Sequence, residues 1–146
     1  MTEILIKRLS KNIPLPKYET DGSSGMDLAA DVKESIEIKP GGSEIIPTGL
    51  AVSIPKNFEI QIRPRSGLAA KNQISILNTP GTIDADYRGE LKVILINLGS
   101  KSFVVEKGLR IAQIVLCPIV KATIKEVETL DNTKRGSGGF GSTGVR

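Results

Sequence analysis

The sequence contains no histidine and only one cysteine, Cys117. The absence of histidine excludes a Ser-His-Asp triad, a histidine general base and a histidine-ligated metal site. One cysteine forms neither an intrachain disulfide nor a zinc cluster, which favours a reducing compartment. Because no histidine can activate it, Cys117 is expected to be a small buried hydrophobe. An aspartate or glutamate is then the natural candidate for any general base.

The sequence also lacks long hydrophobic runs and blocks of like charge. No apolar run approaches the ~20 residues that span a membrane, and the start MTEILIKRLSKN has no signal-peptide core. We therefore expect a cytoplasmic protein with no targeting segment in this chain and no membrane contact. The net charge is +4, but the positive residues are scattered, which argues against a nucleic-acid-binding arm. A modest positive charge also suits binding of a compact polyanion such as a nucleotide, and the net charge alone does not decide between these partners.

The hydrophobic pattern predicts an all-β fold in a chain long enough for one domain. Apolar residues alternate over 50–54 and 58–62, on either side of a turn at 55–57. The runs at 91–98 and 109–120 are apolar on both faces, so each predicts a central strand that is covered on both sides. Turn signals recur about every ten residues, which is typical of a β-sandwich, jelly roll or barrel.

One short helix and a flexible tail complete the predicted organisation. The stretch SGLAAKN, 66–72, predicts a helix of about two turns with Ser66 as its cap. The core-forming pattern stops at about Lys134, and the remaining residues, RGSGGFGSTGVR, are rich in glycine. We therefore predict a β-rich core domain over 1–133 and a flexible C-terminal tail over 134–146.

Two segments place charged residues where a purely structural chain does not require them, and the second also offers phosphate-binding geometry. In SSGMDLAAD, Asp27 lies between apolar residues, and it is either functional or simply a turn carboxylate. In RPRSGLAAK, Arg63, Arg65 and Ser66 precede or open the predicted helix, whose free N–H groups and positive dipole end suit a phosphate. Arg65 adds a charge-assisted fork. The alternative is a helix cap flanked by surface arginines.

The segment NTPGTIDADYRGELKVILIN, 78–97, predicts a β-hairpin whose polar turn covers 84–89. Gly81 leaves room for another group to approach the backbone. Asp84 should be ionised at neutral pH, and an ionised carboxylate can orient and deprotonate a water molecule. Tyr87 is one of two tyrosines and lies in the turn, where core packing does not demand an aromatic residue.

Two further segments carry polar residues in unusual surroundings. Arg110 and Gln113 interrupt an apolar strand, need not share a face at that spacing, and require partners if buried. The alternative is an internal hydrogen-bonded pair or a subunit contact. In the tail, glycines allow close wrapping, Arg135 can meet a phosphate and Phe140 can stack on a nucleobase. The tail lacks the G-K-S/T of a P-loop, which is rejected, and by composition alone it is simply disordered.

These five segments, in this order, resemble the trimeric deoxyuridine triphosphatase (dUTPase) family, and the resemblance covers essentially the whole chain. It implies a jelly-roll-like or distorted β-barrel subunit. It also implies hydrolysis of dUTP to dUMP and pyrophosphate, with Mg²⁺ chelated by the triphosphate. This reaction keeps uracil out of DNA and supplies dUMP for thymidylate synthesis. The expected partners are dUTP and two further copies in a homotrimer, with no stable nucleic acid.

The resemblance also assigns roles to individual residues. Asp84 matches the aspartate that activates the water attacking the α-phosphorus, and Tyr87 matches the tyrosine beneath the deoxyribose, where a 2′-hydroxyl would clash. The positions that match the reader of the uracil edge are Asn78, the backbone from Thr82 through Ile83 to Asp84, and Lys92, and Gly81 is a further expected substrate contact. The positions that match phosphate contacts are Arg65, Ser66, Gly67, Gln113 and, for the γ-phosphate, Arg135. The positions that match the lid over uracil are Phe140, Gly141 and Ser142.

Asp27 matches an aspartate that reaches magnesium through water, and Arg110 matches a residue that stabilises the active conformation. Each active site is expected to combine parts of three subunits. Gln73 stands where the family commonly has glycine, which leaves the local turn conformation open, and Met26 stands where an aromatic is often found. The alternatives are a dCTP deaminase-like enzyme, or a non-catalytic β trimer that binds nucleic acid through its tail.

Overall fold

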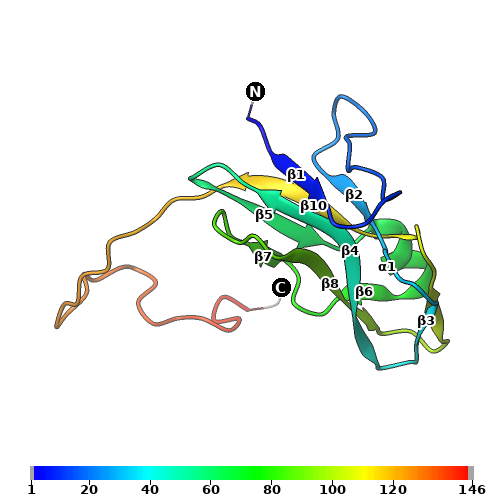
Figure 1. Ribbon diagram of the computed structural model, residues 1–146. Coiled ribbons are helices and arrows are strands. Elements are labelled where there is room, and N and C mark those ends of the chain that lie inside the picture. The colour runs from blue at the N-terminus through cyan, green and yellow to red at the C-terminus, as the bar shows by residue number, and fades with distance from the viewer. Residues whose placement is uncertain (1, 145–146) are drawn as a thin grey trace.

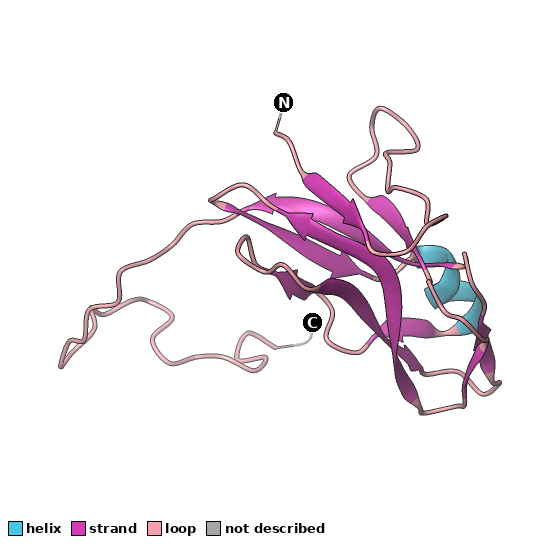
Figure 2. Cartoon of the chain, viewed as in Figure 1, coloured by secondary structure: helices cyan, strands magenta, loops and turns pink. Residues whose placement is uncertain are grey.

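The structure is a computed structural model that describes residues 2–144. Its strands form two layers, and one short helix lies at one end of them (Figure 2). In chain order the elements are β1 Leu5–Arg8, β2 Met26–Ala29, β3 Ile36–Ile38, β4 Ser43–Ser53, β5 Phe58–Arg63, α1 Ser66–Asn72, β6 Ile74–Ile76, β7 Gly81–Ile83, β8 Glu90–Asn97, β9 Phe103–Val105 and β10 Arg110–Pro118 (Figure 1). The expected all-β, jelly-roll-like fold with one short helix is confirmed.

The strands form two four-stranded sheets and one two-stranded sheet, and every described pair is antiparallel. One large sheet has the order β1-β4-β8-β6, the other has the order β2-β10-β5-β7, and β3 pairs with β9. Most neighbours are distant in sequence, so the chain crosses repeatedly between the two layers. In the described part of the chain, no helix has the length and hydropathy that crossing a membrane requires.

The core lies between the two sheets and is built almost entirely from aliphatic side chains. Leu28 on β2, Ile60 on β5 and Ile114 on β10 are fully buried from one layer, and Ile46 and Leu91 are fully buried from the other. Removing these side chains from water is the main favourable contribution to folding. Both predicted central strands, β8 and β10, indeed lie between two neighbours in their sheets.

The expectation that β8 is covered on both faces is only half met within one chain. Leu91, Val93 and Leu95 point into the core and are fully buried, whereas Ile94 and Ile96, on the other face, are only half-buried. This second face therefore remains partly open in the single chain.

The predicted β-hairpin over 78–97 is wrong in its pairing. β7 pairs with β5 in one sheet, and β8 pairs with β4 and β6 in the other. Both edges of β8 are thus occupied by strands from elsewhere in the chain. The loop 84–89 is consequently a crossing between two sheets, and it leaves a gap between β7 and β8 that a hairpin would have closed with hydrogen bonds.

The last strand ends at Pro118, and the chain then leaves the two sheets. The N–H of Ile119 donates to the carbonyl of Asn57 at 2.8 Å. Beyond it the chain contains no further strand or helix up to residue 144, and it extends well away from the sheets before turning back (Figure 1). The division between a core over 1–133 and a tail over 134–146 stays a prediction, and residues 145 and 146 of that tail lie outside the described residues.

Candidate active site

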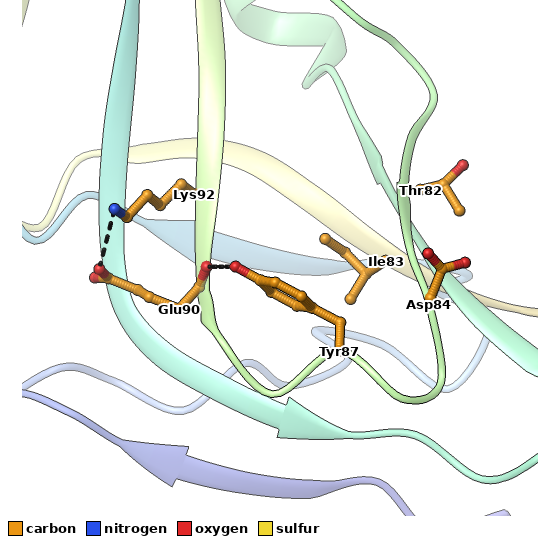
Figure 3. A pocket seen from close by; sticks show the side chains of 6 residues that line it. All are labelled: Thr82, Ile83, Asp84, Tyr87, Glu90 and Lys92. Carbon is orange, nitrogen blue, oxygen red and sulfur yellow. Dashed lines mark hydrogen bonds and ion pairs between the residues drawn. The ribbon is translucent and has the colours of Figure 1, made fainter.

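A small cavity opens where the sheet crossing separates the end of β7 from the start of β8. We call it the loop pocket. Its volume is about 180 Å³, and its lining residues are Thr82, Ile83, Asp84, Tyr87, Glu90 and Lys92 (Figure 3). Cavities that enclose a whole small ligand usually measure ~300–1,000 Å³. The loop pocket is therefore large enough for only part of a nucleotide.

Four local hydrogen bonds hold the loop that carries Tyr87. The Tyr87 N–H donates to the Asp84 carbonyl at 3.1 Å, and the Tyr87 hydroxyl donates to the Glu90 carbonyl at 3.0 Å. The Arg88 guanidinium donates to the carbonyls of Ala85, at 2.7 Å, and of Tyr87, at 3.0 Å. The turn is thus closed on itself, and the tyrosine ring is fixed at both of its ends.

The strand alternation separates the aspartate from the tyrosine. Figure 3 shows Ile83 pointing toward the Tyr87 ring, whereas Thr82 and Asp84 point to the other side of the strand. Successive side chains of an extended strand point to opposite faces, which explains this arrangement. Asp84 is exposed, so its carboxylate is accessible to water and to a ligand.

Glu90 is a pocket residue that the sequence analysis missed. Its Oε1 accepts a hydrogen bond from the Gly49 N–H at 2.9 Å, and its Oε2 lies 4.0 Å from the Lys92 ammonium. Gly49 has φ +67, in an irregular stretch where the pairing of β4 with β8 shifts between Pro47 and Ala51. The only sequence signal for Glu90 was an acidic residue at the start of an apolar strand.

Asn78 and Gly81 lie beside the loop pocket and do not line it. A Cβ built on Gly81 would lie 3.3 Å from Asn78 Nδ2 and 3.4 Å from Ile62 Cβ. The group that approaches the Gly81 backbone in this chain is therefore the Asn78 side chain. That side chain itself is exposed.

A second polar cluster lies on β2 and β10, in the sheet that also contains β7, and at the start of α1. We call it the arginine cluster, and its members are Asp27, Arg65, Arg110 and Gln113. Arg65 Nε lies 3.1 Å from Asp27 Oδ1, and Arg110 Nη1 lies 3.1 Å from Asp27 Oδ2. Arg65 Nη1 also donates to the Arg110 carbonyl at 3.1 Å. Each carboxylate oxygen of Asp27 is thus paired with one arginine.

Gln113 belongs to this cluster because of a register shift. It lies directly opposite Asp27 on β2 and opposite Arg63 on β5, and its Nε2 donates to the Pro64 carbonyl at 2.9 Å. The pairing of β10 with β2 shifts between Arg110 and Ala112. An extra residue at such a shift reverses the facing of all later side chains. Arg110 and Gln113 therefore lie on the Asp27 side together, although their spacing in a regular strand would not do this.

The helix α1 begins differently from the prediction. Arg65 is its N-cap residue, with extended backbone angles and no side-chain cap hydrogen bond, and Ser66 is its first helical residue. The expectation that Ser66 caps the helix is therefore wrong, and its exposed hydroxyl is not used for capping. A Cβ on the next residue, Gly67, would have nothing within 4 Å, so this backbone is open to approach.

Gln73 and Cys117 each answer a question raised by the sequence. Gln73 ends α1 with φ 54 and ψ 33, the left-handed conformation that glycine adopts most readily. This conformation explains why glycine suits the position.

Cys117 is half-buried, with Sγ 3.6 Å from Arg63 Nη2, so the expectation of full burial is wrong. Arg63 itself donates to Gln61 Oε1 at 2.7 Å and does not join the arginine cluster.

The predicted tail residues lie outside both polar regions. Arg135 Nε donates to the Gly138 carbonyl at 2.8 Å, within a local turn, and Phe140 is fully exposed with φ 50. Gly141 and Ser142 are exposed as well. Within the described residues of one chain, the structure does not bring the tail together with Asp84 or Arg65.

The donor groups that the structure provides fit a magnesium ion held mainly by a ligand. Among residues 2–144, no three acidic or cysteine side chains are grouped in a way that could hold a metal. Mg²⁺ keeps several waters and is commonly bound through one carboxylate and the substrate phosphates. A carboxylate has about four acceptor sites, and the two arginines use two of those on Asp27. The remaining sites can accept hydrogen bonds from metal-bound water.

Comparison with solved structures first shows which class of protein this fold and site belong to. Solved structures that match the fold over nearly the whole chain are β-rich nucleotide hydrolases, and the protein is an all-β nucleotide triphosphatase. Within that class, the family model described as dUTPase matches residues 11–144. The chain belongs to the dUTPase family.

Individual relatives agree with this assignment. The deoxyuridine 5'-triphosphate nucleotidohydrolase of Rickettsia bellii (strain OSU 85-389) is 59% identical over 146 residues, covering 99% of this chain and 97% of the relative. The enzyme of the same name from Thermoanaerobacter sp. (strain X514) is 55% identical over 136 residues, covering 93% and 92%. A solved structure of a mutant dUTPase of Staphylococcus bacteriophage 80alpha with dUpNHpp matches with TM-score 0.89 and 29% identity, covering 99% of this chain and 100% of that one.

Proposed function

We propose that the loop pocket binds the nucleoside of the substrate and that the arginine cluster binds its phosphates. The enzyme is a dUTP diphosphatase that hydrolyses dUTP to dUMP and pyrophosphate. The observation that carries the proposal is the loop pocket itself. It combines an accessible carboxylate, an anchored tyrosine ring and a volume suited to part of a nucleotide.

Asp84 is the proposed general base. Its carboxylate accepts a proton from a water molecule while the water oxygen attacks the α-phosphorus. The bond between the α-phosphorus and the bridging oxygen breaks, and pyrophosphate leaves with that oxygen. The exposure of Asp84 supports this role, since both a water molecule and a phosphate can reach it.

Tyr87 is the proposed sugar selector, and its neighbours are the proposed readers of the base. The ring is anchored through its hydroxyl, so it can form a fixed platform against which a 2′-hydroxyl would clash. Backbone groups of Thr82, Ile83 and Asp84, with Lys92, are proposed to read the edge of uracil, and Gly81 is a further proposed substrate contact. Asn78 is proposed to assist from beside Gly81, which it contacts.

Arg65, Ser66, Gly67 and Gln113 are the proposed phosphate contacts. Arg65 already has an anionic partner in Asp27, so phosphate binding would replace or share an existing ion pair. Arg110 is proposed to hold Asp27 in place during that exchange, because it pairs with the other carboxylate oxygen. The Ser66 hydroxyl and the open backbone at Gly67 are free to approach a phosphate.

Magnesium is the proposed cofactor, and Asp27 is proposed to contact it through water. A magnesium ion on the triphosphate would supply neutralisation of phosphate charge during the transfer. A solved dUTPase structure from phage phi11 of S. aureus is described as revealing the coordination of a structural Mg(II) ion, but that protein is only 24% identical. The proposal for this chain rests on its own donor groups.

A homotrimer with shared sites is the proposed assembly. β2, which carries Asp27, and β7, which lines the loop pocket, are the outer strands of their sheet, so Asp27 lies three strand spacings or roughly 14 Å from the strand of the pocket in one chain. A second copy could bring the two regions together on one substrate. Large apolar side chains that are mostly exposed also support burial between copies: Ile45, Leu98, Val120, Ile124 and Leu130.

The tail is proposed as a lid from a third copy. Glycines with positive φ at Gly136, Gly141 and Gly144 give it a backbone that can fold closely over a ligand. Phe140 is proposed to stack on uracil, supported by Gly141 and Ser142, and Arg135 to bind the γ-phosphate.

A single cysteine that forms no disulfide supports a reducing compartment, which we propose to be the cytoplasm.

Product analysis tests the reaction and its selectivity together. The native chain is incubated with magnesium and dUTP, UTP, dTTP or dCTP, and the same panel is run with Asp84→Asn. We expect dUMP and pyrophosphate from dUTP alone, and a loss of about 10²- to 10⁴-fold in Asp84→Asn. Ammonia from dCTP would instead indicate a deaminase. A full rate with Asp84→Asn would remove Asp84 from the proposed mechanism.

A further inference from the structure

Gly89 lies directly against the ring of Tyr87. A Cβ built on Gly89 would lie 2.5 Å from Tyr87 Cζ and 2.9 Å from Cε2, and it would also overlap the Tyr87 hydroxyl oxygen. Real Cβ atoms essentially never approach another heavy atom within 3.0 Å. Any residue other than glycine at this position would therefore require the tyrosine ring to move.

The backbone at Gly89 gives no other reason for glycine. Its φ lies outside the left-handed range, in contrast to Gly49 or Gly108, so an L-residue could adopt the same conformation. The missing side chain at Gly89 is thus explained by the space that the ring occupies.

The ring lies over Gly89 because of its own hydrogen bond. The Tyr87 hydroxyl reaches the Glu90 carbonyl at 3.0 Å, which draws the ring across the intervening residue. Glu90 is in turn held by the Gly49 N–H at 2.9 Å. A methyl group on Gly89 would separate the ring from this acceptor. Since Tyr87 is 43% exposed, the displaced ring could move into solvent or into the loop pocket without unfolding the core.

We propose that Gly89 is a positioning residue that sets the Tyr87 ring and, through it, the selection of deoxyribose over ribose. The inference rests on the proposed role of Tyr87 and adds a residue that acts only through that ring. A misplacement of about 1 Å near reacting groups can cost about 10²-fold in rate. A displaced platform should weaken use of dUTP and relax discrimination against UTP at the same time.

The first experiment compares Gly89→Ala with Gly22→Ala. Gly22 is a matched control because a Cβ there has nothing within 4 Å and its φ is not left-handed. We expect Gly89→Ala to lower kcat/KM for dUTP by about 10- to 100-fold and to lower the dUTP-to-UTP ratio, with no change in Gly22→Ala. An unchanged ratio in Gly89→Ala, with Tyr87→Ala lowering it, would overturn the proposal.

A double-mutant cycle shows whether Gly89 acts through the ring. In the Tyr87→Ala background the overlap is gone, so adding Gly89→Ala should change kcat/KM by less than about 2-fold. An equal loss in both backgrounds would overturn the proposal. If Gly89→Ala alone does not fold, the double variant should fold, and a failure of both to fold would equally contradict a role through the ring.

A measurement without substrate separates this inference from the role proposed for Tyr87. The chain has two tyrosines, so ring signals in ¹³C-tyrosine NMR spectra can be assigned with Tyr18→Phe. Gly89→Ala should shift the Tyr87 signal and leave that of Tyr18 in place, whereas Gly22→Ala should shift neither. An unmoved Tyr87 signal would refute the positioning. A moved signal, with Tyr87→Ala keeping full sugar selectivity, would refute only the role of Tyr87.

Discussion

The loop pocket and the arginine cluster differ in what their polar groups do within one chain. In the loop pocket, backbone hydrogen bonds fix the frame, and the Asp84 carboxylate remains accessible. In the arginine cluster, the charged groups are already paired, with Asp27 bound to Arg65 and Arg110. A ligand can enter the pocket directly, whereas a phosphate bound as we propose would have to compete with the Asp27 carboxylate for Arg65. The comparison shows one region with an accessible carboxylate beside a fixed loop and another whose charges are already paired with one another.

The largest effect should come from mixing subunits that are each defective in one region. Asp84→Asn and Arg65→Ala should each lose about 100-fold or more of the dUTPase rate. Co-expressed in one cell, they should recover activity at least ~10-fold above either variant, because a mixed trimer can contain an intact Asp84 facing an intact Arg65. Pyrophosphate release measures this recovery.

The control for subunit mixing is the double variant Asp84→Asn/Arg65→Ala, which carries both defects on every chain and offers no intact pair. Recovery is expected only where the two substitutions lie on different chains. No recovery in verified mixed trimers would mean that one chain supplies both regions, and the proposal of shared sites would fail.

Deleting residues 135–146 should give the next largest effect. Up to residue 144 this tail contacts neither region in one chain, so its removal should leave the unfolding temperature unchanged. Loss of a stacked aromatic ring and a charged phosphate contact should lower kcat/KM for dUTP by about 100-fold. Full turnover by the truncated chain would contradict a lid that closes over the two regions.

Asp27→Asn should have a smaller effect, on stability, and it tests whether the arginine cluster is held by its charges. Both ion pairs are partly exposed, so we expect the free energy of unfolding to fall by only ~1 kcal/mol in urea at fixed protein concentration. Glu19→Gln removes the exposed pair with Lys17 and should change it by less than ~0.5 kcal/mol. Equal effects of the two substitutions would indicate that Asp27 holds nothing in place.

The smallest effect concerns the residue that ends α1. Gln73→Gly should stabilise the fold by about 0.5–1 kcal/mol, because glycine adopts the left-handed conformation at Gln73 without strain. Asn72→Gly, one residue earlier in the helical conformation, should instead destabilise it by about 0.3 kcal/mol. Thermal unfolding of both variants at one concentration checks the opposite signs, and equal signs would refute the explanation.

Much of the local structure could be predicted because it depends on short spacings. The alternation over 58–62 correctly indicated that Ile60 and Ile62 face the core, and SGLAAKN correctly indicated a helix over 66–72. The pocket residues Thr82, Ile83, Asp84, Tyr87 and Lys92 were also selected from the sequence. Their types and spacing carry the resemblance to the dUTPase family without reference to the fold.

Features that depend on distant partners could not be predicted. β7 pairs with β5 because both edges of β8 are already occupied by β4 and β6. The residues 78–97 alone do not determine this pairing. The common facing of Arg110 and Gln113 depends on a register shift against β2. The contact of Glu90 with Gly49 joins residues 41 positions apart. Each of these contacts joins residues that are distant in sequence, and its hydrogen bonds form only when the sheets have formed.

The amino-acid sequence alone therefore determined the chemical inventory and the strand-forming pattern of this dUTPase. It excluded histidine chemistry, offered Asp84 and Tyr87 as candidate site residues, and specified the apolar periodicity of the core strands. Only the tertiary structure decided that the crossing between sheets opens a pocket beside Asp84, and that Asp27 pairs with both Arg65 and Arg110. The physical reason is that local spacing sets which way a side chain faces, whereas strand pairing sets which distant side chain it meets.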